Sequence, residues 1–597
     1  MALESKKELK PALLVVLQGL FSIEFLLGTY SPPAYATFNL YPAGDLGVSP
    51  SHASWISTIY FAGQAFGLFI GPWFDRAFGR VKSLLLSIGF FALFDFLVAI
   101  SSDYYLSLFF RLLLGISGGS TMTLCQLNLL DYYPISRWPF VTTYFGFLQV
   151  SVFGFGPVVG GFINESFGWR AYFLTSCSLH IICGLIISWI LLVLTEKRQE
   201  DTPVPHPFDW IGFMLLLFAA LCFQTLVTRG QDEDWYNSTF IDLLFLFGGI
   251  SLLYFVVWEM GEKNPFINLK LFFKPTFLIS SIITPISFAI VYGLFSTLVF
   301  TLQVLKNHTN FSSFQAGLAM APLLFFLPII YPLSVFLSPR INPKIVASIL
   351  LILLGIFCYW TGYYDFFNKR AFFDQFFNQY ILFTQVLNGA YVGLVPALNA
   401  IAINGLSKKN QESAVNTSIL LRTYFLTWGG GLLGTMLMEH RRDFQQTRLV
   451  ETFTGQNSES LSFIASLQHL GLNNLQIQSK MVEQAASHSI ILALDDTYRL
   501  CSWIFFLMAI LVWIPAMKKK EYNFLKIFYN VCRKEKNDPK IILALAKYYH
   551  GMLFIYGALD KRQILQRSFS AISVNAYWHD GCRLCYSAKR HTCCSSP

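Results

Sequence analysis

The chain has 597 residues, of which 54% are hydrophobic and only 13% are charged, and its formal net charge is +9. Soluble domains carry about 25% charged residues, so this composition excludes a soluble globular protein and predicts a chain that crosses a bilayer many times. In such a protein an excess of Lys and Arg relates to topology rather than to nucleic-acid binding. We therefore expect an all-α polytopic membrane protein with no nucleic-acid partner.

Apolar stretches of about 20 residues, the length that crosses a bilayer, recur along the chain. The first has no small-residue cleavage site, so we expect an uncleaved span rather than a signal peptide. Fourteen spans are expected near residues 11–31, 52–72, 83–101, 105–127, 140–163, 171–194, 210–228, 239–258, 276–302, 314–336, 344–361, 379–403, 413–438 and 498–517.

Basic residues orient these spans. Lys and Arg concentrate in the segments on the same side as the N-terminus, among them residues 6–10, 76–82 and 518–520. Because basic loops remain in the cytoplasm, both termini are expected there, in a multi-pass protein of the inner (plasma) membrane.

Two segments are too polar to cross the bilayer. Residues 439–497 contain helical patches and should form an external cap or a flexible loop. Residues 518–597 begin with three lysines and end with four closely spaced cysteines, a poor spacing for a tetrahedral zinc site. We expect a cytoplasmic tail and no bound metal. Cysteines in the apolar runs are expected to be small buried hydrophobes.

Residues 71–82, between the second and third spans, combine an Asp, two Arg and a Lys with bracketing glycines. In a chain with so little charge, this cluster is expected in a tight cytoplasmic loop, where an ion pair can join two helices and then release them. Asp75 should face the N-terminus of a neighbouring helix or a nearby Arg, and Gly71 and Gly79 should allow a close turn. The alternative is a loop that only sets topology.

Three side chains that are charged at neutral pH in water lie inside predicted spans of the first half, namely Glu24, Asp95 and Arg111. A buried guanidinium is costly, so Arg111 should face the bundle interior and meet a carboxylate or helix carbonyls; the alternative is an Arg that snorkels to the interface. A carboxyl group in low-dielectric surroundings favours its neutral form and can exchange a proton near neutral pH. We expect Glu24 to be a proton carrier or a contact of a cationic substrate, and Asp95 to share this role or to be a structural acid.

The fifth span contains the string Gly156-Pro157-Val158-Val159-Gly160-Gly161. Small residues let helix backbones approach closely, and an internal proline bends a helix. We expect a kinked, tightly packed contact between the two halves of the protein that resists leakage. The glycines at 429–431 predict similar packing in the thirteenth span, where Arg422 needs a partner.

Three strings, one each in the 71–82 segment, the fourth span and the fifth span, resemble the marker motifs of the major facilitator superfamily in their order and spacing. The fourth span resembles R-x-x-x-G-x-x-G, beginning at Arg111. The charged segment resembles G-x-x-x-D-R-x-G-R-[RK] at Gly71, Asp75, Arg76, Gly79 and Arg80. The fifth span resembles the antiporter motif G-P-x-x-G-G at Gly156, Pro157, Gly160 and Gly161. With fourteen expected spans, the chain resembles the fourteen-span drug:proton antiporter branch of that superfamily, the bacterial multidrug efflux type. The resemblance covers residues 10–517.

The resemblance implies two six-helix bundles, residues 1–200 and 276–517, with two linking transmembrane helices in residues 201–275. It implies a secondary active transporter that expels amphipathic or hydrophobic small molecules in exchange for protons. In this interpretation Glu24, Asp95 and Arg111 serve proton coupling or substrate contact, and residues 71–80 form a conformational latch. Some members of the branch work with a periplasmic adaptor protein, so the resemblance allows an adaptor at residues 439–497.

The sequence contains no nucleotide-binding GxxxxGK[ST] loop, no paired metal carboxylates and no nucleophile motif. We therefore expect neither a cofactor nor an enzymatic activity. Two alternatives remain open: a specific metabolite or siderophore exporter or importer of the same fold, and a membrane sensor that does not transport.

Overall fold

The computed structural model describes residues 11–133, 137–195, 209–262, 265, 267–304, 311–363, 393–406, 408–452 and 458–514. Within these ranges the chain is predominantly helical and has no strand, which confirms the all-α prediction. Ten helices in this part are long and apolar enough to cross a membrane. Fourteen spans remain a prediction, because most of 379–403 and the tail 518–597 lie outside the described residues.

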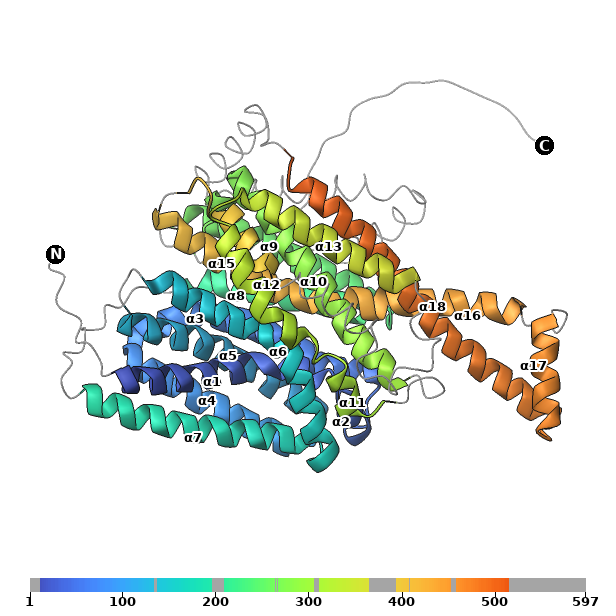
Figure 1. Ribbon diagram of the computed structural model, residues 1–597. Helices are drawn as coiled ribbons and strands as arrows, with labels where there is room; N and C mark the ends of the chain where they lie inside the picture. Colours follow the sequence, from blue (N-terminus) through green and yellow to red (C-terminus); the bar gives the residue numbers. More distant parts are fainter. Residues whose placement is uncertain are drawn as a thin grey trace, which may run out of the picture. The chain divides into compact units, whose positions relative to one another are not determined.

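Six long helices form the first half and lie side by side (Figure 1). Helix α3 packs along α5, α4 packs against both α5 and α7, and α1 packs against α5 and α6. Their bounds, with the short α2, are α1 (Pro11–Tyr35), α2 (Leu40–Asp45), α3 (Pro50–Phe78), α4 (Arg80–Ile100), α5 (Tyr104–Tyr132), α6 (Trp138–Phe167) and α7 (Trp169–Thr195).

The second half contains shorter and interrupted helices. The predicted tenth span, for example, is divided by a turn into α11 and α12. The elements are α8 (Trp210–Arg229), η2 (Trp235–Asn237), α9 (Thr239–Gly261), η3 (Leu269–Phe273), α10 (Pro275–Val304), α11 (Ser313–Leu318), α12 (Leu323–Leu337), α13 (Pro343–Tyr363), the apolar helix Gly393–Ile403, α15 (Lys408–Gly429), the π-helix η4 (Gly430–Glu439), α16 (His440–Thr452), α17 (Ser458–His469) and α18 (Asn474–Leu511).

The junction between α3 and α4 is much tighter than the loop expected at residues 71–82, so that expectation is wrong in extent. Helix α3 continues to Phe78, and α4 begins at Arg80. Gly79 alone separates them, with a φ of 83°, a conformation that glycine adopts without a Cβ clash. The charged residues of the motif therefore lie on the last turn of one helix and the first turn of the next.

Most of residues 439–497 is helical. Helix η4 runs directly into α16, and α17 and the first part of α18 follow. Arg441 donates to Asp496 at 2.6 Å and Gln445 donates to the same carboxylate at 2.8 Å, which joins α16 to α18. Of the two expected forms, a cap or a flexible loop, this paired arrangement fits a cap. Its side of the membrane remains a prediction.

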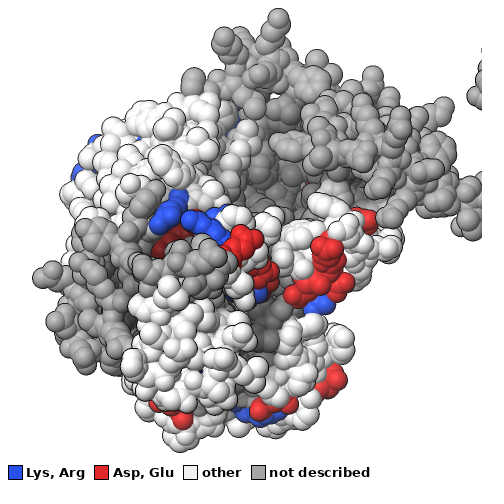
Figure 2. Space-filling model, turned by 90° about the vertical axis from the view of Figure 1, so that its right-hand side faces the viewer, with Lys and Arg blue, Asp and Glu red and all other residues white. Residues whose placement is uncertain are grey.

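The surface and the cysteines agree with a membrane protein. Large apolar side chains such as Phe90, Leu185 and Trp189 are exposed on α4 and α7. In the face that Figure 2 shows, most of the visible described surface carries no charge, and charged groups gather in a few small clusters.

Six cysteines in apolar helices are buried and unbridged, as predicted: Cys125, Cys177, Cys183, Cys222, Cys358 and Cys501.

The contact between α3 and α5 depends on glycines. A Cβ added at Gly67 would lie 2.1 Å from the Ile116 carbonyl oxygen, and one at Gly119 would lie 2.1 Å from the Gln64 carbonyl oxygen. Real Cβ atoms cannot approach a backbone oxygen so closely, so any larger residue forces the two helices apart. This close approach brings α5, and with it Arg111, against α3.

Gly119→Ala is therefore expected to destabilise the protein by about 1–3 kcal/mol, the usual cost of overpacking. Gly89→Ala is the matched control, because a Cβ at Gly89 meets no atom within 4 Å. Thermal unfolding of the purified proteins, followed by loss of monodisperse material after heating, measures the difference. Equal melting temperatures for the two variants would contradict this account of the α3–α5 contact.

Candidate functional site

Two of the predicted acids meet at a histidine inside the first half. The side chains of Glu24 on α1 and His180 on α7 are fully buried, and Glu24 Oε2 lies 2.6 Å from His180 Nδ1. On the other side of the ring, His180 Nε2 lies 4.0 Å from Oδ2 of Asp95, which is 2% exposed on α4. Three neighbouring helices thus contribute one ionisable group each to a single cluster.

Packing holds the histidine ring in this cluster. The ring of Phe91 on α4 lies edge-on against it, with centroids 4.1 Å apart. Ser176, one turn earlier on α7, is buried beside the carboxylate of Asp95. Both contacts come from the same pair of helices, so α4 and α7 together fix the position of His180 relative to Asp95.

The cluster keeps unused hydrogen-bonding capacity. Glu24 Oε1, Asp95 Oδ2 and His180 Nε2 are buried and have no hydrogen-bond partner among the described residues. Buried polar atoms without partners are costly, and they are rare in folded proteins outside functional sites. Because such atoms lower the stability of the fold, a functional role explains the cluster better than a stabilising one does.

Arg111 provides the fixed positive charge of the same region. Its side chain is fully buried; Nε donates to the Ile56 carbonyl at 3.0 Å and Nη1 donates to Ser31 Oγ at 2.9 Å. The guanidinium also lies 4.9 Å from the centroid of the Tyr60 ring, with the rings of Tyr35 and Phe173 at 5.4 and 5.0 Å.

The predicted position of Arg111 is thus confirmed, and snorkelling is excluded. Its hydrogen bonds go to a carbonyl and a hydroxyl rather than to a carboxylate, but Asp95 is close enough for electrostatic attraction. With Glu24 and Asp95 ionised and His180 protonated, the charges of the cluster and of Arg111 cancel. One proton therefore gives this low-dielectric region a net charge of zero.

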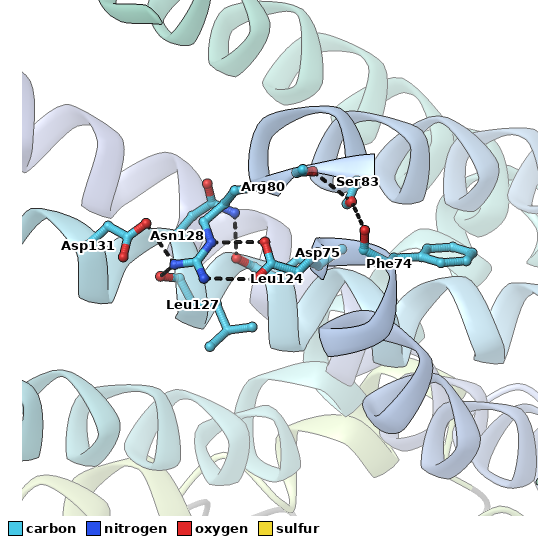
Figure 3. A network of polar contacts seen from close by, with 9 residues as sticks. Phe74, Asp75, Arg80, Ser83, Leu124, Leu127, Asn128 and Asp131 are labelled. Atoms are coloured by element: carbon cyan, nitrogen blue, oxygen red, sulfur yellow. Dashed lines mark hydrogen bonds and ion pairs between the residues drawn. The ribbon is translucent and has the colours of Figure 1, made fainter. Parts of the chain in front are cut away.

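The motif at residues 71–80 forms a separate polar network (Figure 3). Arg80 binds Asp75 through two parallel contacts, Nε to Oδ1 at 2.9 Å and Nη2 to Oδ2 at 2.8 Å. Its Nη1 lies 2.7 Å from Asp131 Oδ2 and donates to the Leu127 carbonyl at 3.0 Å. Of the two partners expected for Asp75, the structure has the arginine. These contacts join α3, α4 and α5 within the first half, whereas Arg76 is exposed.

The glycine motif of α6 lies where the two halves meet. A Cβ at Gly160 would lie 2.7 Å from Ala34 Cβ of α1, and one at Gly161 would lie 2.3 Å from the Ser313 carbonyl oxygen of α11. Gly317 of α11 comes equally close to the Pro157 carbonyl. The motif therefore packs against its own half on one side and against the second half on the other. This is the tight contact between halves that the sequence predicts.

Polar bonds extend that contact. Asn164 Nδ2 donates to Ser313 Oγ at 3.1 Å, and the Phe314 backbone N–H donates to Glu165 Oε2 at 3.2 Å. Elsewhere between the halves, Arg422 of α15 donates to Gln149 of α6. Gln149 is thus a partner for Arg422, which the sequence left unassigned.

His180 is the member of this buried cluster that sequence reasoning missed. A lone histidine in an apolar helix is more often a satisfied core residue, and nothing in the sequence connects it to Glu24 or Asp95. One signal is present: Ser176 and His180 are one turn apart, on the same face of a largely apolar helix. The structure brings Glu24, Asp95 and Arg111 into one region, and it places Asp75 and Arg80 in another.

Comparisons with known proteins agree with the fold and the motifs. A sequence model of the Major Facilitator Superfamily matches residues 20–421, which is more than half of the chain. "Multidrug export protein EmrB" of Haemophilus influenzae is 26% identical over 472 residues, covering 79% of this chain and 89% of that protein. "Fatty acid resistance protein FarB" of Neisseria gonorrhoeae is also 26% identical, covering 79% of this chain and 90% of its own length.

A solved structure supports the fold alone. The crystal structure of a POT family transporter in complex with a thioalcohol-conjugated peptide has a TM-score of 0.52 at 14% identity, and the match covers 84% of this chain and 97% of that one. The motif residues, the helical architecture and the match over residues 20–421 lead to one assignment. This chain is a multi-pass membrane protein that belongs to the major facilitator superfamily.

Proposed function

We propose that this protein is a proton-coupled secondary active transporter, which expels amphipathic or hydrophobic small molecules by alternating access. The observation that carries the proposal is the buried cluster of Glu24, His180 and Asp95, whose unused polar atoms suit a site that gains and loses a proton. The names of the relatives, multidrug export and fatty acid resistance proteins, support small-molecule efflux as the activity.

The proton cycle follows from the charges. With one proton, the cluster and Arg111 are neutral; without it, the region carries one net negative charge in a low-dielectric environment. Such a charge is costly, so the deprotonated protein either binds a cation or changes to a conformation in which water reaches the cluster. Binding and release of one proton can thus bias the equilibrium between two conformations.

Helix α1 connects the cluster to the contact between halves. It carries Glu24 at its centre, and near its end Ala34 packs against Gly160 of the α6 motif. Pro32 and Pro33 lie between these points, where a helix bends most readily. A change of charge at Glu24 can therefore move α1 against α6, which in turn contacts α11.

The remaining expectations belong to the same proposal. They are two six-helix bundles, residues 1–200 and 276–517, joined by helices within 201–275; both termini in the cytoplasm; an inner (plasma) membrane location; and no enzymatic activity. A periplasmic adaptor at residues 439–497 is also included, supported by apolar side chains such as Phe444 and Val482 that α16 and α18 expose there.

Glu24→Gln is expected to abolish substrate-linked proton movement, because glutamine keeps the shape of the side chain but cannot ionise. Compounds are chosen by susceptibility profiling of a deletion strain, and proton release is followed with a pH-sensitive dye in inverted membrane vesicles. Glu451→Gln, at an exposed position on α16, is the control and should behave as the wild type. Normal, pH-responsive transport by Glu24→Gln would show that Glu24 is not the proton carrier.

The same assay separates the alternatives. If the wild type shows no substrate-dependent proton movement under any tested condition, the result favours a membrane sensor. Efflux or uptake of one metabolite or siderophore only, with no change in drug susceptibility, favours a specific exporter or importer.

Arg80→Lys is expected to slow transport without weakening substrate binding, because lysine retains the charge but loses the two-pronged contact with Asp75. A partly exposed ion pair of this kind contributes about 0.5–2 kcal/mol, enough to shift a two-state equilibrium several-fold. Efflux rate and equilibrium binding are measured on the same preparation. The control is Arg137→Lys, at an exposed position outside the motif; equal rates in the two variants would exclude Arg80 as part of a latch.

A further inference from the structure

The imidazole of His180 lies between two carboxylates that come from different helices. Its Nδ1 is 2.6 Å from Glu24 Oε2, and its Nε2 is 4.0 Å from Asp95 Oδ2. An imidazole can accept a proton at one nitrogen and release one from the other, and it titrates near neutral pH. Carboxylates on opposite sides of one ring are therefore arranged for transfer through that ring.

We propose that His180 is a proton bridge between Asp95 and Glu24, a role that rests on the proposed proton-coupled transport. In the transfer, a proton leaves Asp95 Oδ2 and forms an N–H bond at His180 Nε2. The N–H bond at Nδ1 breaks, and its proton forms an O–H bond with Glu24 Oε2. The transfer involves no oxidation or reduction. Asp95 becomes ionised, Glu24 becomes neutral, and His180 remains neutral with its proton on the other nitrogen.

The two sides of the bridge differ in their donor–acceptor distance, and the longer side interrupts proton transfer until it closes. The Glu24 side is a formed hydrogen bond, whereas 4.0 Å on the Asp95 side exceeds hydrogen-bond length by about 1 Å. Phe91 packs against the ring, so the gap changes only when α4 and α7 shift or the Asp95 side chain rotates. In the described conformation the bridge is connected to Glu24 and interrupted at Asp95.

Other titratable groups surround the cluster without replacing the bridge. Arg111 is the fixed charge beside Asp95, and Cys125 and Cys183 lie near enough to Glu24 to interact with it electrostatically. From α1, α3 and α7 come further groups close enough to Asp95 to interact with it, namely Tyr30, Tyr60, Tyr172 and Cys177. His180 is the group in the described part of the chain whose two nitrogens face both acids.

His180→Asn separates a bridging role from a structural one. The asparagine amide reaches the position of Nδ1 and can still hydrogen-bond Glu24, but it cannot carry a proton. The purified wild type and variant are reconstituted into liposomes, with ethidium and dodecanoate as probes. Two quantities are measured for each: proton release linked to probe transport, and exchange of labelled for unlabelled probe, which needs no net proton movement. Ser178→Ala, at an exposed position two residues before His180 on α7, is the matched control.

We expect His180→Asn to lose proton release by at least about tenfold while probe exchange remains within about twofold of the wild type, as for loss of a proton-transferring group. Ser178→Ala should keep both. Full proton release in His180→Asn, with a normal wild type, would overturn the bridge and leave the proposed function standing. Probe exchange without proton release in the wild type would overturn the proposed function and the bridge together.

A folding defect is addressed by a second substitution. If His180→Asn also loses probe exchange, His180→Gln is measured in the same way, since its longer amide reaches toward Asp95 instead. Retained exchange with lost proton release in His180→Gln supports the bridge. Loss of exchange in both variants assigns His180 a structural role and overturns it.

Discussion

A charge inside a membrane protein must be neutralised by partners that the fold brings to it, and the rest of this structure depends on that constraint. Glu24, Asp95, His180 and Arg111 come from α1, α4, α7 and α5, and with one proton their charges sum to zero. No single helix can satisfy this requirement. The packing of the first half, including the glycine contact between α3 and α5, serves to place these four groups in one region.

The same constraint suggests why a change of protonation can move the protein. Helix α1 carries Glu24 and also the residues that pack against the α6 motif, and α6 is in backbone contact with α11 of the second half. Because glycines make these contacts, they are close and allow little intermediate geometry. In the proposed mechanism, a small displacement of α1 would therefore favour one discrete arrangement of the halves over another. The Asp75–Arg80 pair strengthens the other end of the same bundle.

Much of this arrangement was predictable from the sequence, because it depends on local rules. Burial of Arg111 follows from the cost of a charge in lipid, and the contact of Gly161 with α11 follows from small residues in a span. His180 was not predictable, since its role exists only where three helices meet. The loop expected at residues 71–82 was wrong because the positive φ of Gly79 turns the chain in one residue. Its charged neighbours then remain helical.

The central claim is that the charge of the buried cluster determines how α6 meets α11. Amide hydrogen–deuterium exchange of the purified protein tests it most directly, in residues 154–161 and 313–318. After correction for intrinsic rates, wild-type protection in both segments should change between about pH 5 and pH 8, the range over which imidazole side chains generally change charge, and Glu24→Gln should suppress that change. Identical pH dependence in the wild type and in Glu24→Gln would contradict the account.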